Sequence, residues 1–352
     1  MEKLRIGIIG AGSISHFHMV GYQANSDIAE VTAVCDLNLE RAQEFAKKYN
    51  VPHVYGSYDE MLRDAPIDAV SVTTWNNAHA PATIAALKAG KHVLCEKPLA
   101  MNAREAQQME DTAKEAGRLL MVGFVRRFAQ NTDALKAVID GGDLGEIYSS
   151  KVSVIRRWGN PGGWFSDKKR SGGGALIDLG VHIIDLARYL AGNPRPVSVY
   201  AATFSKLGMK PDITGVEKYK TADYDEYCDV EDAATALIRF DNGMVTYLNV
   251  TWVENAEDSS MMHFSGSKGG AQLEPVLEIY QDRHHYLTTT RPKLQYQGLD
   301  MNDIFTKEIR HFVTCARDGT PCLCPAEDGV WLMKILDAIY ESAKTGHEVQ
   351  IG

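Results

Sequence analysis

Short apolar runs alternate with amphipathic stretches along the first 123 residues. Near-continuous runs of apolar and β-branched residues are typical of strands buried on both faces of a parallel sheet. The predicted strands are Leu4–Ile9, Val31–Cys35, Ala69–Thr73, His92–Cys95 and Leu119–Gly123. Helical patterns lie between them at Leu39–Tyr49, Pro81–Ala89 and Ala103–Ala116. This alternation predicts a doubly wound parallel sheet with right-handed crossovers.

The pattern changes after Gly123, where longer strand-like runs and fewer helices follow. The predicted strands are Ile147–Arg156, Val197–Phe204, Ala233–Phe240, Met244–Val253 and Met261–Gly266, and the predicted helices are Asn131–Asp140, Ala175–Ala191, Asp303–Arg317 and Ala326–Thr345. Asp241-Asn242-Gly243 is a hairpin turn signal between two of the strands. The fold class is therefore α/β, with residues 1–123 as one domain and 124–352 as a second, α+β domain with a mainly antiparallel sheet.

Composition and charge narrow the class of protein. The 352 residues are 45% hydrophobic and 24% charged, which excludes disorder, collagen and coiled coil as overall descriptions. Lys plus Arg is 37 against 46 for Asp plus Glu, so the net charge is −9, which argues against a nucleic-acid or anionic-membrane partner. No apolar run has transmembrane length, and residues 1–5 lead into a strand without a signal-peptide pattern. The expected location is cytoplasmic.

The cysteines give little sign of a metal centre. His311, Cys315, Cys322 and Cys324 could be drawn as a metal site, but their spacing fits no usual zinc pattern. Reduced thiols, several of them buried in apolar segments, are the simpler interpretation, and no metal is predicted.

A glycine turn follows the first predicted strand. In the segment Gly10-Ala11-Gly12-Ser13-Ile14-Ser15, Gly10 would permit a tight turn, and Gly12 would let backbone N–H groups approach a pyrophosphate at a helix N-terminus. Asp36 ends the second strand, where a carboxylate can bind ribose hydroxyls. Leu37 is uncharged, so NAD is expected rather than NADP. The alternative is a plain glycine turn with a solvated Asp36.

Two further stretches carry candidate chemistry. Glu96-Lys97-Pro98 places a lysine at the carboxyl edge of the sheet, where ligands of such folds bind, although loop charges are the simpler alternative. Asp178 and His182 are four residues apart, so they share a helix face among apolar neighbours, and a carboxylate can orient an imidazole there. The glycines of 172–174 would allow close approach to a ligand. A satisfied Asp–His pair inside a core helix is the alternative.

These motifs together give the chain a family resemblance over nearly its full length. It resembles the glucose–fructose oxidoreductase, inositol dehydrogenase and rhizopine catabolism family of NAD(P)-dependent oxidoreductases. The matching features are Gly10–Ser15, Asp36, Thr73-Thr74-Trp75-Asn76 with His79, Glu96-Lys97-Pro98, Gly123–Phe128, Gly172–Asp185 and Ser265–Gly270. The departures are Ser15, at the third position of the glycine motif, and a segment, 205–231, that aligns with no substrate type.

The resemblance implies a Rossmann domain joined to a domain with an open-faced sheet, commonly an oligomer interface, so a homotetramer or homodimer is expected. It implies that Lys97, Asp178 and His182 form the catalytic group and also contact substrate. The expected NAD-binding residues are Gly10, Gly12, Ser13, Ile14, Asp36, Leu37, Thr73, Thr74, Trp75, Asn76, His79, Glu96, Lys97 and Arg126. Arg127, Trp158 and Trp164 are further substrate-binding candidates, with a surface salt bridge and buried aromatics at the domain junction as the alternatives.

The sequence thus predicts an NAD-dependent dehydrogenase that oxidises a secondary hydroxyl of a sugar, inositol or related polyol. His182 would accept the hydroxyl proton, Asp178 would orient the imidazole or bind a neighbouring hydroxyl, and Lys97 would bind the reacting oxygen. One alternative is a glycosidase that uses bound NAD for transient oxidation and elimination. Another is a nucleotide-binding regulator without chemistry, which would not need a proton acceptor.

Overall fold

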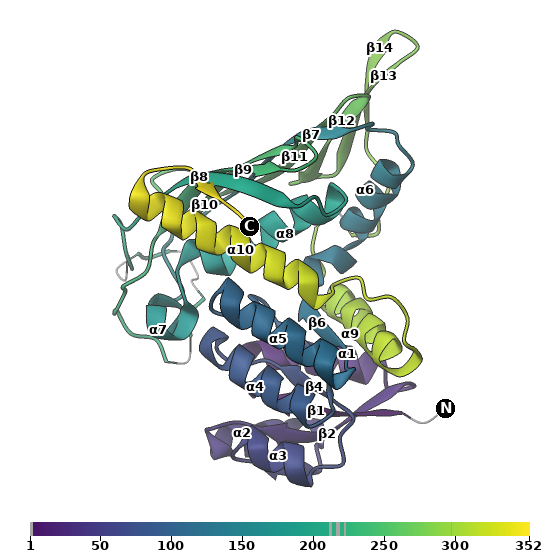
Figure 1. Ribbon diagram of the computed structural model, residues 1–352, viewed down its shortest axis with the longest axis vertical. Coiled ribbons are helices and arrows are strands. Elements are labelled where there is room, and N and C mark those ends of the chain that lie inside the picture. Colours follow the sequence, from purple (N-terminus) through teal and green to yellow (C-terminus); the bar gives the residue numbers. More distant parts are fainter. Residues whose placement is uncertain (1–2, 211–212, 216–218, 222, 297) are drawn as a thin grey trace. The chain divides into compact units, whose positions relative to one another are not determined.

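The chain forms two compact units. The computed structural model describes residues 3–210, 213–215, 219–221, 223–296 and 298–352. The first unit comprises Met1–Phe128 with Asp300–Val330, and the second comprises Ala129–Leu299 with Trp331–Gly352 (Figure 1). The first unit ends five residues after the predicted boundary between residues 123 and 124, and it takes in a second, distant segment.

The first unit is a six-stranded parallel sheet in the order β3-β2-β1-β4-β5-β6, as the sequence predicts for a doubly wound fold. Its strands are β1 (Leu4–Ile9), β2 (Ala29–Cys35), β3 (His53–Tyr55), β4 (Ala69–Val72), β5 (His92–Glu96) and β6 (Leu120–Gly123). Its helices are α1 (Ser13–Ala24), α2 (Leu39–Tyr49), α3 (Tyr58–Asp64), α4 (Asn76–Lys88), α5 (Ala103–Ala116), η1 (Val125–Phe128) and α9 (Met301–Asp318). Because β1 pairs with both β2 and β4, the strand order reverses there, and ligands of such sheets bind at this switch point.

Helix boundaries in the first unit follow local side-chain chemistry. Asn102 caps α5 by accepting a hydrogen bond from the Glu105 N–H, and Gly117 ends that helix in the left-handed conformation. Helix α4 differs, because it begins at Asn76 instead of the predicted Pro81. A proline inside a helix removes one backbone hydrogen bond, and the turn before Pro81 is helical all the same.

Helix α9 belongs to the first unit because it packs on α1. The Asn25 side-chain amide, just after α1, donates to the Thr306 carbonyl oxygen at 2.9 Å. A Cβ on Gly21 would lie 2.6 Å from a side-chain carbon of Ile309, so only glycine permits this close approach of the two helices. Residues after α9 extend the sheet edge, where the Val122 N–H donates to the Cys324 carbonyl oxygen at 2.9 Å.

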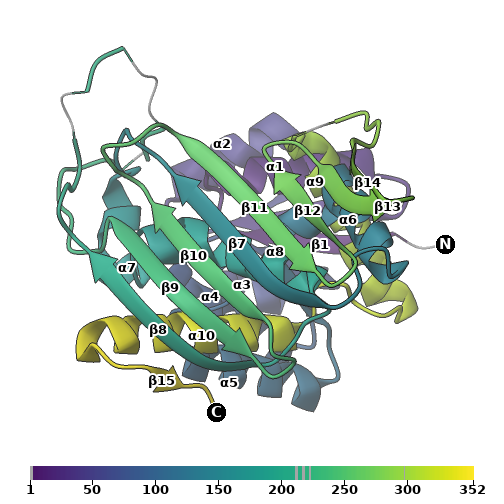
Figure 2. The same ribbon diagram turned by 90° about the horizontal axis from the view of Figure 1, so that it is seen from above.

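The second unit contains a nine-stranded sheet in the order β14-β13-β12-β11-β7-β10-β9-β8-β15, seen face-on in Figure 2. Its strands are β7 (Ile147–Ile155), β8 (Pro196–Phe204), β9 (Ala233–Phe240), β10 (Val245–Thr251), β11 (Ser259–Gly266), β12 (Gly269–Glu274), β13 (Glu278–Arg283), β14 (Tyr286–Thr290) and β15 (Val349–Gln350). The helices are α6 (Gln130–Asp140), η2 (Gly163–Ser166), α7 (Lys168–Ser171), η3 (Leu176–Gly180), α8 (Val181–Leu190) and most of α10 (Ala326–Thr345). Neighbouring strands are antiparallel except β7 and β10, which confirms the prediction of a mainly antiparallel sheet.

One face of this sheet carries exposed aromatic and apolar side chains. Tyr200, Leu237 and Tyr247 are cross-strand neighbours on β8, β9 and β10, and each is between 45% and 57% exposed. Inward-facing neighbours such as Ile238 and Leu248 are fully buried against the helices of the unit. The alternation along β9 therefore marks one face as core and the other as an apolar surface.

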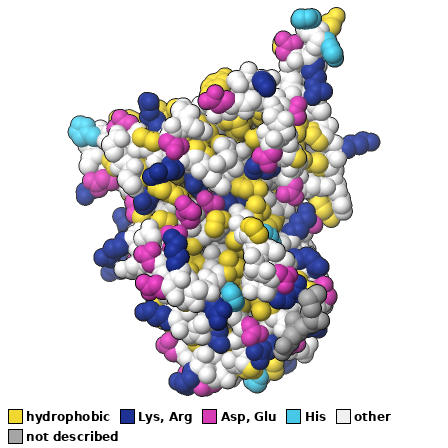
Figure 3. Space-filling model, turned by 45° about the vertical axis from the view of Figure 1, so that its right-hand side comes forward, with side chains coloured by type: hydrophobic (Ala, Val, Ile, Leu, Met, Phe, Trp, Pro, Cys, Tyr) yellow, Lys and Arg dark blue, Asp and Glu magenta, His cyan; other side chains and the backbone are white. Residues whose placement is uncertain are grey.

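Basic and acidic side chains intermingle on the face of the molecule drawn in Figure 3. Among the described residues, none of the helices has the length and apolar character needed to span a membrane.

Candidate functional site

The glycine turn after β1 lies where the sequence places a phosphate site. Gly10 has a φ of +96°, and a Cβ there would lie 2.8 Å from the Thr73 carbonyl oxygen, so this position requires glycine. A Cβ on Gly12 would meet nothing within 4 Å, although Gly12 is the N-cap of α1. Ser13, the first residue of α1, is exposed, and Ile14 is half-buried. The helix thus begins beside open space, which fits a pyrophosphate bound to its N-terminal N–H groups.

Asp36 holds this turn to the end of β2. Its Oδ2 accepts a hydrogen bond from the Ala11 N–H and its Oδ1 accepts one from the Asn38 N–H, both at 2.8 Å. The Arg41 guanidinium lies 3.7 Å from Oδ2. Each carboxylate oxygen has a second lone pair, so this side chain can still accept from ribose hydroxyls. Leu37 beside it is 92% exposed.

The segment after β4 is tied to its neighbours by two side chains. The Thr73 hydroxyl donates to the Gly10 carbonyl oxygen at 2.7 Å. The ring of His79 lies between two carbonyl oxygens, with Nδ1 2.7 Å from that of Pro98 and Nε2 3.2 Å from that of Thr74. Burial lowers the pKa of His79 below its ordinary value, so the ring is neutral and donates to one of them. Thr73 and His79 therefore link three loops at the carboxyl edge of the sheet.

Trp75 and Asn76 differ in accessibility. Trp75 is 40% exposed and Asn76 is 5% exposed at the start of α4. Of this predicted set, Thr74 and Trp75 are thus presented at the surface of the unit, and Thr73, Asn76 and His79 form the support beneath them.

Glu96 and Lys97 have opposite environments although they are adjacent. Lys97 is half-buried, whereas Glu96 is only 6% exposed. The Glu96 carboxylate accepts from His18 Nε2 at 2.8 Å and from the Lys97 N–H at 3.2 Å. The Glu96 carboxylate therefore faces the interior of the unit and holds the backbone of Lys97, and a contact between Glu96 and NAD stays a prediction.

The two arginines after β6 also differ. Arg126 is half-buried, whereas Arg127 has no exposed surface. The Arg127 guanidinium donates to the Leu323 carbonyl oxygen at 2.7 Å and to Asp328 at 2.9 Å. Arg127 thus links η1 to the start of α10 inside the unit, and its binding of substrate stays a prediction.

Asp178 and His182 are the accessible residues of an otherwise buried helical segment. From Ala175 to Leu190, all residues except Asp178 and His182 are buried, and these two are half-buried. The predicted single helix is a π-helical turn, η3, followed by α8, so the two side chains lie at the junction of the two. The Trp252 Nε1–H donates to Asp178 Oδ2 at 2.9 Å and fixes that carboxylate.

Glu231 holds the start of this helical segment and was not predicted. Its carboxylate accepts from the N–H groups of Gly174 and Leu176 at 2.9 and 3.0 Å, and from the Tyr340 hydroxyl at 3.0 Å. A Cβ on Gly174 would lie 2.0 Å from the Glu231 carbonyl oxygen, and one on Gly173 would lie 2.0 Å from Tyr340 Oη. Gly173 and Gly174 therefore make room for Tyr340 and Glu231, and their close approach to a ligand stays a prediction.

The two candidate tryptophans are half-buried in the loop before η3. The Arg156 guanidinium lies 5.2 Å from the centre of the Trp158 ring, and the Trp164 ring lies 4.0 Å from that of Phe165. Segment 205–231 contacts this loop, because a Cβ on Gly163 would meet the Thr221 hydroxyl at 2.2 Å. Residues 211–212, 216–218 and 222 of that segment lie outside the described residues.

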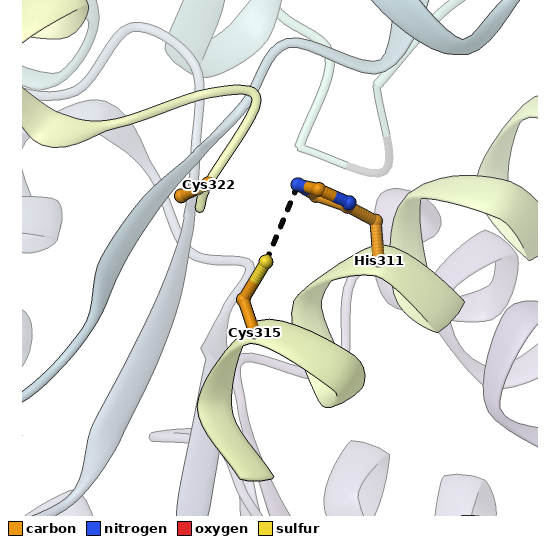
Figure 4. Close-up of side chains that lie close together, drawn as sticks. All are labelled: His311, Cys315 and Cys322. Atoms are coloured by element: carbon orange, nitrogen blue, oxygen red, sulfur yellow. Dashed lines mark hydrogen bonds between the residues drawn. The ribbon is translucent and has the colours of Figure 1, made fainter. Parts of the chain in front are cut away.

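A histidine and two cysteines lie together in the first unit, at the end of α9 (Figure 4). A ring nitrogen of His311, Cys315 Sγ and Cys322 Sγ lie within 4.8 Å of one another, and Cys315 Sγ is 3.4 Å from His311 Nε2. The Leu323 N–H donates to the same Nε2 at 2.8 Å, so its lone pair already has a partner. Burial raises the pKa of Cys322 to about 12, which keeps this thiol protonated. In this structure the cluster is thus a hydrogen-bonded turn.

Sequence reasoning missed Glu231, Tyr340, Trp252 and His18. Each acts on a predicted residue from a distant part of the chain, and none stands in a recognisable motif. The one available signal was an acidic residue, Glu231, directly before the apolar strand β9, and such residues are common at strand ends.

Comparison with known proteins agrees with this geometry. Residues 4–124 match the oxidoreductase family with an NAD-binding Rossmann fold, and residues 132–272 match the C-terminal domain of the same Gfo/Idh/MocA family. The chain belongs to the Gfo/Idh/MocA oxidoreductase family. It is an NAD-binding oxidoreductase with a Rossmann unit, which confirms the predicted family, cofactor and enzyme class.

Relatives in this family cover the whole chain. D-glucoside 3-dehydrogenase of Escherichia coli is 35% identical over 99% of this chain and 98% of its own length. Myo-inositol 2-dehydrogenase of Thermotoga maritima is 27% identical over 99% of this chain and 98% of its own. A structure of levoglucosan dehydrogenase with NADH and L-sorbose has a TM-score of 0.88 at 26% identity, covering 100% of both chains.

Proposed function

We propose that the protein is an NAD-dependent dehydrogenase that oxidises a secondary ring hydroxyl of a sugar, glycoside or inositol. When bound, NAD supplies the hydride acceptor. The protein contributes the residues that bind and orient the alcohol and take its proton.

The observation that carries this proposal is the accessibility of Asp178 and His182. They are the two residues of 175–190 that are not buried, on a segment whose other side chains form the core of its unit. An imidazole and a carboxylate at the two accessible positions of this segment, with the carboxylate held by Trp252, are suited to bind a substrate hydroxyl and take its proton.

In the proposed reaction His182 accepts the proton of the substrate hydroxyl, which is the role of a general base near neutral pH. Asp178, held by Trp252, orients the imidazole or a neighbouring hydroxyl. Lys97 donates a hydrogen bond to the reacting oxygen, and its backbone is held by Glu96. Trp158 and Trp164 are half-buried ring faces suited to stack on the carbon face of a sugar.

The relatives support the proposed substrate class. The relatives named above act on a glucoside or an inositol, or bind a sugar in the solved complex. A glucoside, an inositol and a sugar all carry several secondary hydroxyl groups. Asp36, followed by the uncharged Leu37, supports NAD over NADP, because a 2′-phosphate would meet a like charge.

The test is to incubate the purified protein with NAD and a panel of glucosides, inositols and free aldoses, and to follow NADH absorbance. Stoichiometric NADH with one class supports the proposal and names the class. Conversion of a glycoside to free sugar without net NADH would instead identify the glycosidase with transient oxidation. NAD binding without turnover on any member would point to a regulator.

We also propose that the protein is a homotetramer or homodimer through the exposed face of the nine-stranded sheet. Tyr200, Leu237 and Tyr247 form a contiguous apolar row, and a large exposed apolar surface is unusual in a monomer. Light scattering should give a mass of two or four chains, and Leu237→Asp should reduce it. A particle of one 38.8 kDa chain in the unmodified protein contradicts the proposal.

A further inference from the structure

Behind the strand end that carries Lys97 lies a buried polar cluster, which we call the Glu96 cluster. It comprises His18 and Tyr22 of α1, Ser71 of β4, Glu96 of β5 and Glu308 of α9. All five side chains are buried, with 6% exposure or less, and all belong to the first unit. None of them except Glu96 belongs to a motif of the site.

Four members form a continuous chain of hydrogen bonds. Tyr22 Oη lies 2.8 Å from Ser71 Oγ, which lies 3.2 Å from His18 Nδ1. His18 Nε2 lies 2.8 Å from Glu96 Oε1. Oε2 of the same carboxylate accepts from the Lys97 N–H at 3.2 Å. Glu96 is therefore the end of the chain and its link to the catalytic lysine's backbone.

Glu308 is the exception in this cluster. It has no exposed surface, and neither carboxyl oxygen has a hydrogen-bond partner among the described residues. The side chain cannot turn to water, because α1 and α9 are in close contact at Gly21 and the rings of His18 and Phe305 lie 5.4 Å apart. A buried carboxyl without donors requires an explanation.

Two buried carboxyl groups that interact cannot both ionise at low cost, so one holds a proton. Burial raises the pKa of Glu96, but the hydrogen bond from His18, with the charge of Lys97, outweighs this and holds that pKa below its ordinary value. Burial, reinforced by the charge of Glu96, raises the pKa of Glu308 well above its ordinary value. The proton therefore resides on Glu308.

The other groups packed around α9 do not offset the effect of Glu96 on the pKa of Glu308. Helix α1 contributes His18, which is bonded to Glu96, and Tyr22, whose pKa burial raises well above its ordinary value, so that its phenol is uncharged. The η1 turn contributes Arg126 and Arg127, and the Arg127 guanidinium is bound to Asp328. Glu96 is thus the charge that Glu308 responds to.

We propose that Glu308 is a positioning residue for the Glu-Lys-Pro turn: it remains protonated in the working enzyme, so that Glu96 carries the only negative charge of the cluster and keeps its bonds to His18 and to the Lys97 N–H. This inference rests on the role proposed above for Lys97. When Glu308 loses its proton, two carboxylates in one buried space repel each other. Glu96 can reduce this repulsion by moving away from its hydrogen-bond donors. The Lys97 N–H then loses the acceptor that holds the backbone of Lys97 in place.

The test compares the wild-type enzyme with Glu308→Gln, which is neutral at every pH and nearly the same size. Glu115→Gln, an exposed glutamate on α5, is the matched control. The first measurement is the infrared carbonyl band of a protonated carboxyl group at neutral pH. We expect this band in the wild type and in Glu115→Gln, and its loss in Glu308→Gln.

The second measurement is the pH profile of kcat and KM with the best substrate found. We expect the alkaline limb of kcat to move upward in Glu308→Gln with little change in KM, whereas a space-filling role would leave the profile unchanged. One pH unit beyond the wild-type limb, the variant should be about tenfold faster, since loss of one essential proton lowers the rate tenfold per unit.

Two outcomes overturn the proposal: no protonated carboxyl band assignable to Glu308 in the wild type, or superimposable alkaline limbs. If Glu308→Gln does not fold, Glu308→Met tests the same charge argument with a neutral apolar chain of similar length. Failure of the proposed catalysis is separable, because it appears as normal turnover in Lys97→Met, whereas the infrared band reports the proton of Glu308 whatever Lys97 does.

Discussion

Gly12 in the first unit and Gly174 in the second both begin a helical segment of the site, yet for opposite reasons. A Cβ on Gly12 would meet nothing within 4 Å, and one on Gly174 would lie 2.0 Å from the Glu231 carbonyl oxygen. The first glycine leaves open space at the helix start, where we propose that NAD binds, and the second permits protein packing. The same residue type before a helix therefore carries a binding signal in one unit and a folding signal in the other.

The largest expected effect concerns the chemistry that both units supply. His182→Ala should lower kcat by about 10²–10⁴, because it removes the proton acceptor. NAD affinity should barely change, since the proposed cofactor contacts lie in the first unit. Turnover and NAD binding, measured on the same preparation, check this.

Lys97→Met is the companion variant from the first unit and should also lower kcat strongly. Normal turnover in His182→Ala would contradict the mechanism. Lost NAD binding in a folded His182→Ala protein would make the helical segment a cofactor support.

The glycine comparison can be tested directly with two alanine variants. Gly174→Ala should destabilise the protein by about 3 kcal/mol, because overpacking against a backbone oxygen leaves no room to relax. Gly12→Ala should leave the melting temperature nearly unchanged and weaken NAD binding, because its methyl group would occupy the space beside the α1 N-terminus. Thermal unfolding without and with NAD separates the two, and equal loss of stability in both variants would remove the distinction.

The cofactor preference of the first unit gives a smaller effect. Asp36→Ala removes the group that would repel a 2′-phosphate and that would accept from ribose hydroxyls. Hydrogen bonds to a charged group contribute about 1.5–3 kcal/mol, so the wild type should favour NAD over NADP by at least ~10-fold, and the variant should narrow that ratio. Equal kcat/KM for both cofactors in the wild type would refute the assignment.

The smallest effect is expected where the second unit holds Asp178. Trp252→Phe keeps the ring and removes the Nε1–H that binds Asp178 Oδ2. We expect kcat to fall by less than about tenfold, which corresponds to about 1.4 kcal/mol, since the carboxylate remains in place but is less well fixed. Steady-state kinetics beside a melting curve check this, and an unchanged kcat would show that Asp178 needs no such support.

The difference between the two units also decides what sequence reasoning could find. In the first unit the useful signals are local. They are the order of elements, the glycine turn, Asp36 and the Glu-Lys-Pro turn, and each motif can be recognised within one short segment between a strand and a helix. Arg127 and Glu96 were assigned to ligands because their charge is visible in the sequence. Their buried partners, Asp328 and His18, lie about 200 and 80 residues away along the chain, as the pairings show.

In the second unit the accessible pair was predicted, but its support was not. Asp178 and His182 are visible as spaced polar residues in an apolar helix. The π-helical turn between them, the carboxylate of Glu231 and the indole of Trp252 depend on contacts between segments more than 50 residues apart, which periodicity does not report. Strands β12–β14 were also missed, because their polar composition hides the alternation of a strand.

The packing of α9 on α1 has a consequence for synthesis on the ribosome. Residues 1–128 emerge first, but the helix that covers α1 begins at Met301, near the end of the chain. During translation, at about 5–20 residues per second, one flank of the nascent Rossmann sheet therefore stays uncovered for roughly ten seconds or more. A gene fragment cut after residue 128 would reproduce that unfinished state permanently, so exchange of cofactor modules between relatives has to carry the late segment, residues 300–330, with the early one.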